Sequence, residues 1–242
     1  MRATSSTRAI ARVTAAIVAC ERCPRLRTYC EAVARGKRAA YRDETYWGRP
    51  VPGFGDPDAR IYLLGLAPAA HGANRTGRVF TGDGRGGSGD FLFGALHRAG
   101  YASRPTSVAA DDGLVLDDVY VGAAVRCAPP ANKPTPGEIA TCLDHLDAEL
   151  AALHRVRVVV ALGQIAWKAW LDRQARHGAV PRPRPAFGHG AVARVGDGPL
   201  LVGCFHPSRQ NTHTGRVTPA MYDDLFGRLL PSLLEPADPG AL

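Results

Sequence analysis

Four short apolar segments stand out along a chain in which polar and apolar residues are otherwise mixed. Each segment is rich in Leu, Val or Ile and lacks a strict alternation of polar and apolar positions. That pattern is typical of parallel strands that are buried on both faces. The sequence therefore predicts β-strands at Arg60–Leu66, Val119–Val125, Val156–Leu162 and Leu200–Phe205.

Segments with helical spacing of their apolar residues lie between these strands and after the last one. The predicted helices are Asp90–Ala99, Thr135–His154, Gln164–His177 and Thr218–Leu234. Strands that alternate with helices indicate βαβ units. We therefore predict an α/β protein, folded as a three-layer α/β/α sandwich around a central, mainly parallel four-stranded sheet.

Two local signals refine the helices. Thr135 is followed by Pro136 and, three residues on, by Glu138, a capping-box pattern that places the start of that helix. Near the N-terminus, Arg8 and Arg12 interrupt the apolar residues of the first 19 positions. This spacing favours an amphipathic helix over a targeting segment.

The length of 242 residues fits one α/β domain. We predict a single domain over residues 1–242, with a core from about residue 20 to about residue 234 and flexible ends. No apolar run approaches the roughly 18 residues that a membrane span needs. We therefore expect a soluble protein that does not contact a membrane.

Three loops rich in polar residues follow the first, second and last predicted strands. They are Ala67–Gly89, Arg126–Pro136 and His206–Arg216. In open parallel sheets, ligands bind outside the carboxyl ends of the strands. The three loops therefore predict one shared functional site.

Composition narrows the class of protein and of partner. Hydrophobic residues make up 45% of the chain and charged residues 21%, which excludes disordered, collagen-like and coiled-coil proteins. Lys and Arg number 30 against 22 Asp and Glu, a formal charge of +8. This excess favours a polyanionic partner, although charge alone does not separate nucleic acid from an acidic lipid surface.

The six cysteines are too few for a disulfide framework in a chain of this length. Cys20 and Cys23 form a C-x2-C pair, and Cys127 and Cys142, contributed from elsewhere, can close a four-thiolate site with them. The alternative is that some of these cysteines are small buried residues. Zinc and a [4Fe-4S] cluster both accept four cysteines, and spacing does not choose between them. The remaining two, Cys30 and Cys204, are expected to be small buried residues.

Three motifs occur in a fixed order around these cysteines. They are GLAPAAHGANRTGRVFTGD at Gly65–Asp83, RCAPPANKPTP at Arg126–Pro136 and HPSRQNTHTGR at His206–Arg216. With the cysteines, this set resembles the family 5, or B-type, uracil-DNA glycosylases, from about Cys20 to about Leu230. The Gly-rich stretch 84–89 is longer than the family's usual turn.

The resemblance implies the fold of the uracil-DNA glycosylase superfamily and removal of deaminated bases from DNA. It also implies a structural [4Fe-4S] cluster on Cys20, Cys23, Cys127 and Cys142. The expected partner is double-stranded DNA. Whether the protein also binds single-stranded DNA is left open. The expected protein is a monomer in a bacterial-type cytoplasm, associated with the nucleoid.

A glycosylase must flip its target nucleotide out of the duplex, and then stack the base and stabilise the leaving group. Phe80 fits the stacking platform, and His206 fits a hydrogen-bond donor to the base oxygen, for which a neutral imidazole suffices. The resemblance implies that Asp83 orients the attacking water and that Asn132 contacts the substrate. The other expected substrate-binding residues are Gly65, Ala67, Ser208 and Arg209.

The alternatives for these residues are structural. Phe80 would be a core aromatic residue, Asp83 a turn or cap residue, and Asn132 the start of an Asx turn. Basic residues are concentrated on the same loops and are expected, as a group, to meet DNA phosphates. They are Arg75, Arg78, Lys133, Arg209 and Arg216.

The first motif carries Leu66 and Ala67 at its second and third positions, where other families of glycosylase place an acid. A pocket with small apolar walls discriminates weakly against a purine, so we predict release of hypoxanthine as well as uracil. The leading function is a monofunctional DNA glycosylase that leaves an abasic site. Two alternatives stay open here: a catalytically silent or adduct-forming uracil-DNA binding protein, and an iron–sulfur redox protein, which explains the cysteines but not the loops.

Overall fold

The computed structural model describes residues 5–84, 86–179 and 182–235. The outermost parts of the predicted flexible ends, residues 1–4 and 236–242, therefore lie outside the described residues. Over the described residues, one sheet has the strand order β1-β3-β2-β4-β6-β5. The strands are β1 (Phe54–Gly55), β2 (Ile61–Gly65), β3 (Val119–Ala123), β4 (Val158–Leu162), β5 (Val192–Ala193) and β6 (Leu200–Cys204).

The four predicted strands form the parallel centre of the sheet, in the order β3-β2-β4-β6. The predicted strand count of four is wrong for the described residues, because β1 and β5 pair antiparallel with β3 and β6 at the two edges. Each edge strand has only two residues, Phe54–Gly55 and Val192–Ala193. Strands this short leave no apolar run in the sequence.

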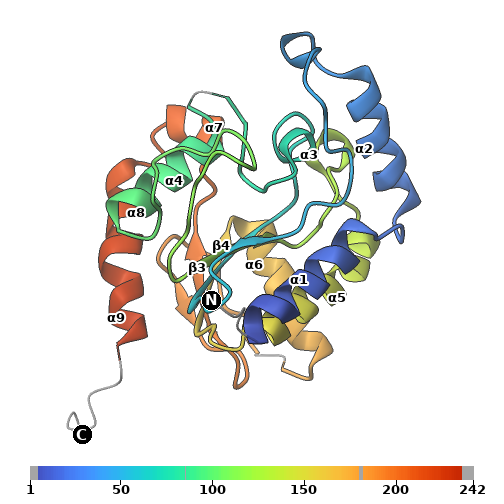
Figure 1. Cartoon of the computed structure of the whole chain (residues 1–242). Coiled ribbons are helices and arrows are strands. Elements are labelled where there is room, and N and C mark those ends of the chain that lie inside the picture. The colour runs from blue at the N-terminus through green and yellow to red at the C-terminus, as the bar shows by residue number, and fades with distance from the viewer. Residues whose placement is uncertain (1–4, 85, 180–181, 236–242) are drawn as a thin grey trace, which may run out of the picture.

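Alternate residues of the central strands face two separate cores, which makes the three layers. Ile61 and Leu63 of β2 pack in one core, while Tyr62 and Leu64 pack in the other. The first core also contains residues of α4 (Ser88–Arg98), α8 (Pro219–Asp224) and α9 (Leu230–Leu234). The second contains residues of α5 (Pro136–Ala152) and α6 (Gln164–Arg176), so helices cover both faces of the sheet (Figure 1).

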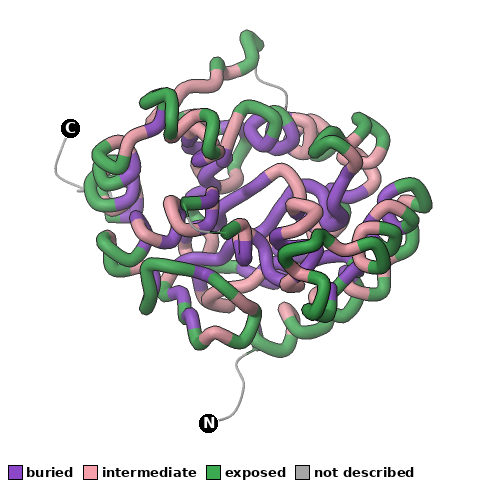
Figure 2. Tube along the Cα trace, turned by 90° about the horizontal axis from the view of Figure 1, so that it is seen from above, coloured by how far each residue is buried: buried purple, intermediate pink, exposed green. Residues whose placement is uncertain are grey.

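The N-terminal helix α1 (Ser5–Val18) lies along α5 (Figure 1). Thr135 caps α5 as predicted: its side chain accepts from Glu138 N–H, and the Glu138 carboxylate accepts from Thr135 N–H. Seen from above, the buried chain runs through the middle of the molecule and exposed turns surround it (Figure 2). Among the described residues, no helix has the length and apolar character that a membrane crossing requires.

The predicted helix Thr218–Leu234 consists of three pieces. A π-helical turn, η3 (Leu225–Leu229), separates α8 from α9. Pro231 explains the break, because proline has no N–H to donate to the turn before it and its ring crowds the carbonyl four residues earlier. A widened turn relieves both problems.

Several short helices and one long one were not predicted. The long one is α2 (Pro24–Gly36), which begins directly after Cys23 with proline in its first turn. The others are η1 (Ala39–Tyr41), α3 (Ala73–Thr76), η2 (Pro130–Asn132) and α7 (Arg209–His213). Three of these short helices, α3, η2 and α7, lie within the three polar loops.

Candidate active site

A cavity of about 600 Å³ opens at the carboxyl ends of the parallel strands. Residues at the ends of β2, β3 and β4 line its floor, and residues that follow β6 form one wall. The chain leaves β2 and β4 toward opposite sides of the sheet, so the cavity lies at the topological switch point, where open α/β sheets bind ligands. All eight predicted catalytic and substrate-binding residues line it: Gly65, Ala67, Phe80, Asp83, Asn132, His206, Ser208 and Arg209.

Phe80 is held in an uncommon backbone conformation. Its φ angle is +52°, in the left-handed region that residues other than glycine rarely adopt. Two glycines make room for it: a β-carbon at Gly89 would lie 2.0 Å from the Phe80 carbonyl oxygen, and one at Gly65 would lie 3.0 Å from the ring. The loop therefore presents the Phe80 ring above the end of β2.

His206 follows β6 and faces Phe80, with the two ring centroids 6.1 Å apart and the planes tilted by 35°. Burial lowers the pKa of His206 to about 4. The imidazole is therefore neutral near pH 7, the form that the sequence analysis found sufficient for a hydrogen-bond donor. Within the described residues no hydrogen bond occupies its ring, and His206 lines the cavity.

Asp83 ends the loop that carries Phe80. Its carboxylate lies against Gly72, where a β-carbon would stand 1.9 Å from Oδ1. Burial raises the pKa of Asp83 to about 6, against the opposing effect of Arg209 and Arg75. A carboxylate with this pKa is ionised at neutral pH and retains appreciable basicity, as a general base requires.

Asn132 lies at the rim of the cavity and is exposed. It follows Ala131, and both residues have left-handed φ angles, +56° and +52° respectively. Asparagine tolerates this conformation better than most residues, whereas alanine is strained in it. The strain shows that the backbone of the second loop is held in a defined shape beside the cavity.

The other predicted substrate-binding residues divide into wall and rim. Gly65 and Ala67 belong to the wall that follows β2, and Ala67 also packs against the cysteine region. Ser208 uses its hydroxyl to cap α7, accepting from Asn211 N–H at 3.3 Å. Arg209 is exposed, and its Nη2 donates to the Asp83 carbonyl oxygen at 3.3 Å.

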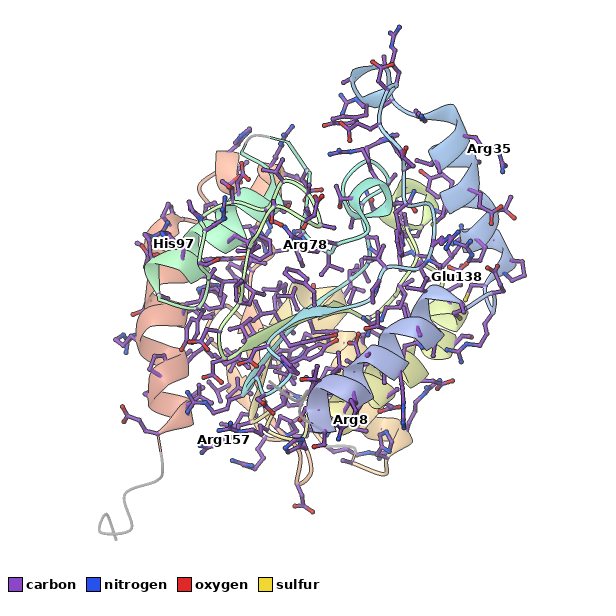
Figure 3. All side chains as sticks on the ribbon, in the orientation of Figure 1. Arg8, Arg35, Arg78, His97, Glu138 and Arg157 are labelled. Atoms are coloured by element: carbon purple, nitrogen blue, oxygen red, sulfur yellow. The ribbon has the colours of Figure 1, made fainter. Side chains whose placement is uncertain are left out.

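The expectation that Arg75 and Arg78 meet phosphates is wrong. Both side chains are buried, at 9% and 6% exposure, and their donors bond within the protein. Arg75 bonds the carbonyls of His71 and Gly82, and Arg78 lies between α3 and α4 (Figure 3), where it bonds Thr81. They anchor the first loop. Lys133, Arg209 and Arg216 are exposed, and their contact with phosphates as a group stays a prediction.

Sequence reasoning missed the contribution of the turn after β4. Gly163, Gln164 and Ile165 line the cavity at the start of α6, and Ile165 is 50% exposed. β4 ends at Leu162 and α6 begins at Gln164, so no long polar loop marks this turn in the sequence. The available signal was topological, because the end of β4 lies on the same edge of the sheet as the three polar loops.

Known proteins with similar sequences identify the family to which this site belongs. A family model described as the uracil DNA glycosylase superfamily matches residues 52–230. The type-5 uracil-DNA glycosylase of Mycobacterium tuberculosis (strain CDC 1551 / Oshkosh) is 54% identical over 219 residues, which cover 90% of this chain and 79% of that protein. The chain belongs to the uracil-DNA glycosylase superfamily.

Two further type-5 uracil-DNA glycosylases come from other organisms. That of Thermus thermophilus is 52% identical over 206 residues, covering 85% of this chain and 90% of the relative. That of Pyrobaculum aerophilum is 46% identical over 202 residues, covering 84% of each. These findings confirm the predicted family, the α/β fold class and the prediction of a uracil-DNA glycosylase. The roles of single residues and the single-domain organisation stay predictions.

Four cysteines of this glycosylase, Cys23, Cys30, Cys127 and Cys142, lie in one cluster that also contacts Ala67 of the cavity wall. All six cysteines of the chain are free thiols. Two thiols already accept hydrogen bonds: Cys142 from Arg126 N–H at 3.3 Å and Cys20 from Arg22 Nε at 3.5 Å. Such donors commonly surround the sulfurs of iron–sulfur clusters.

Four cysteine thiols are the donor type that an iron–sulfur cluster takes. The four come from three separate segments: the residues before α2, the loop after β3, and α5. Across the described residues, however, no three Cys, His, Asp or Glu side chains stand at the spacing of a metal site. Cys30 and Cys204 are fully buried, and the Cys30 thiol contacts Cys127 and donates to the Ala128 carbonyl at 3.6 Å.

Proposed function

We propose that the cavity holds a uracil flipped out of DNA and that the enzyme hydrolyses its N-glycosidic bond. One observation carries this assignment: Phe80, Asp83 and His206 line a single cavity at the switch point of the sheet. A base that stacks on Phe80 lies next to a neutral imidazole and a basic carboxylate. Those are the groups that hydrolysis of this bond needs.

Each residue has a distinct step. Asp83 orients a water molecule toward the sugar C1′ and takes its proton as the new C–O bond forms. The C1′–N bond breaks, and its electron pair leaves with the base. His206 donates a hydrogen bond to the base oxygen on which the negative charge develops. Asn132 contacts the base from the rim, and the product is an abasic site.

The test measures binding and chemistry side by side. Asp83→Asn keeps the size of the side chain but removes its basicity, so the single-turnover rate should fall by about 10²–10⁴-fold. Duplex affinity in a gel shift should stay within about twofold, because Asp83 acts on the transition state and not on ground-state binding. An unchanged rate would remove Asp83 from the mechanism, and equal losses of rate and affinity would reassign it to substrate binding.

The proposed substrate range includes hypoxanthine and other deaminated bases. The wall after β2 is built from Leu66, Ala67, Pro68 and Ala69 and carries no acid. A wall without paired hydrogen-bonding groups rejects a purine weakly. A panel of duplexes containing uracil, hypoxanthine, xanthine or hydroxymethyluracil tests this. Ala69→Leu should fill the cavity and reduce release of hypoxanthine more than release of uracil; uracil-only activity in the unmodified enzyme would contradict the proposal.

We further propose that Cys20, Cys23, Cys127 and Cys142 hold a [4Fe-4S] cluster. When bound, the cluster cross-links the start of α2, the loop after β3 and α5, so its contribution is structural. Ala67 belongs both to this region and to the wall of the cavity, which supports a link between the cluster and the shape of the site.

Anaerobic purification decides between iron–sulfur and zinc. The protein should be brown, with iron and sulfide in equal amounts, and Cys142→Ala should lose most of both. Cys204→Ala is the matched control, since Cys204 is also buried but lies outside the four. A colourless protein with one equivalent of zinc would overturn the assignment. For the whole enzyme we propose a monomer that acts on DNA in the bacterial cytoplasm, at the nucleoid.

A further inference from the structure

Two buried arginines hold the loop that carries Asp83, each from a different side. Arg78 donates to the Thr81 hydroxyl at 3.0 Å, to the Ser107 hydroxyl at 2.7 Å and to the Asp112 carboxylate at 2.7 Å. Arg75 donates through Nη2 to the Gly82 carbonyl at 2.7 Å. Gly82 immediately precedes Asp83, so Arg75 holds the peptide to which the carboxylate is attached.

Arg75 is itself fixed on every side. Its Nε donates to the His71 carbonyl at 2.9 Å, its Nη1 pairs with Glu44, and its guanidinium lies over the Tyr41 ring at 4.0 Å from the centroid. The contact with the loop is tight: a β-carbon at Gly82 would stand 2.6 Å from Nη2. The planar fork of an arginine makes these contacts at once, which a lysine ammonium cannot do.

The charges around Asp83 are few. Burial raises its pKa, Arg209 on α7 and Arg75 on α3 lower it, and Asp90 on α4 raises it. The Gly89 N–H donates to the carboxylate, which favours the ionised form. His206 shares the cavity but is neutral near pH 7. Glu44 partly offsets Arg75, although it is 47% exposed and therefore screened by solvent.

We propose that Arg75 is the positioning residue of Asp83, because it fixes the Gly82 peptide and places a buried positive charge on the loop that carries the carboxylate. This inference rests on the proposed role of Asp83 as the group that orients water. Arg75 touches neither water nor base and acts only through Asp83. Its contribution therefore divides into geometry, which sets the maximal rate, and charge, which sets the pH at which the rate is lost.

Three variants separate geometry from charge in single-turnover cleavage measured from about pH 4 to about pH 9. In the unmodified enzyme the rate should fall on the acid side as Asp83 is protonated. Arg75→Gln should move the midpoint of that fall up by about one pH unit, because an opposite charge is removed. Arg75→Lys should return the midpoint toward its original value but leave the maximal rate reduced. Arg78→Gln, which loosens the same loop and is not among the main charges on Asp83, should reduce the maximal rate without moving the midpoint.

Asp83→Asn separates failure of this inference from failure of the proposed function. If Asp83→Asn abolishes the acid-side fall and Arg75→Gln does not move it, the role of Arg75 is overturned and that of Asp83 stands. Should Asp83→Asn keep both rate and fall, both assignments are overturned. A carboxyl NMR titration measures the pKa of Asp83 directly, with its signal identified by its absence from Asp83→Asn. This measurement does not depend on which step limits the rate. If Arg75→Gln does not fold, Arg75→Lys still tests the geometric half.

Discussion

The carboxylate of Asp83 lies directly against the backbone of Gly72, so that a β-carbon at position 72 would stand 1.9 Å from Oδ1. Gly72 precedes α3, and Asp83 ends the same loop, so the two residues close it. The Asp83 carboxylate can lie in this place because Gly72 has no side chain. That position matters more for chemistry than for folding, because the atom that would be displaced is the end of a side chain.

Gly72→Ala should fold normally and yet lose activity. The new methyl group forces the Asp83 carboxylate to rotate away, and a misplacement of about 1 Å at a catalytic group costs on the order of 100-fold in rate. Thermal unfolding should change by no more than a few degrees. Gly36→Ala is the control, since nothing lies within 4 Å of its β-carbon. Full activity in Gly72→Ala would show that the carboxylate does not need its present position.

Asp83 should also lower the stability of the enzyme above its pKa. Its folded pKa of about 6 exceeds the ordinary value of 3.8, so it contributes stability below about pH 4 that is lost as the pH rises through 6. This pKa shift corresponds to a loss of at most about 3 kcal/mol in the free energy of unfolding. Asp83→Asn should therefore increase the free energy of unfolding at pH 8 relative to its effect at pH 4, measured by urea denaturation.

Asp112 provides the opposite sign as a control. Burial disfavours its charge, but Arg78 and three backbone N–H groups outweigh burial and lower its pKa to about 2. Its stabilisation is present above pH 4 and is lost as the pH falls toward 2. Asp112→Asn should therefore destabilise the protein at neutral pH. If both variants changed stability in the same direction with pH, the assigned environments would be wrong.

The sequence predicts those features whose cause is local. The central strands are continuous apolar runs, and Asp83 and His206 stand directly in loops that follow them, so the position of the site could be predicted. The burial of Arg75 could not, because its partners Glu44 and Gly82 reach it only after folding. The sequence around Arg75 is basic and polar, and such a stretch looks the same whether it faces solvent or a buried carboxylate.

The same distinction explains the errors in the fold. The edge strand Phe54–Gly55 exists because β3 offers it a partner, and two residues carry no periodicity of their own. The break at η3 depends on Pro231. The sequence contains this proline, but it does not predict that one widened turn accommodates the proline within the helix. Local pattern thus predicts which elements form, and tertiary contacts decide their edges.

Phe80 should be required as a ring and not merely as an apolar residue. Stacking of a base on an aromatic side chain is worth about 1–3 kcal/mol, so Phe80→Leu should weaken inhibition by free uracil by about 5-fold to 150-fold. Phe80→Tyr keeps the ring and should retain binding. The positive φ angle of Phe80 burdens all three residues equally, so backbone strain does not confuse the comparison. Equal inhibition of the Leu and Tyr variants would exclude stacking.

The ion pair between Arg126 and Glu149 should be the most sensitive polar contact in the core. Both side chains are 1% exposed, and the carboxylate accepts from Arg126 at 2.9 and 2.7 Å. The Tyr62 hydroxyl and the Gly53 N–H complete its shell, at 2.5 and 3.0 Å. Glu149→Gln keeps the shape but leaves a buried guanidinium uncompensated, at a cost of about 3–5 kcal/mol in the free energy of unfolding.

Burial is what makes the Arg126–Glu149 pair costly to break, and the chain offers a matched exposed pair for comparison. Arg98 and Asp223 form an ion pair of similar length whose side chains are 49% and 45% exposed, so Asp223→Asn should cost about 0–1 kcal/mol. Replacing both buried partners, with Arg126→Met and Glu149→Leu together, removes the stranded charge and should recover part of the loss. Recovery stays incomplete because Tyr62 and Gly53 still lose their acceptor. A double variant less stable than Glu149→Gln would show that the hydrogen-bonded shell, and not the unpaired charge, determines the stability of this region.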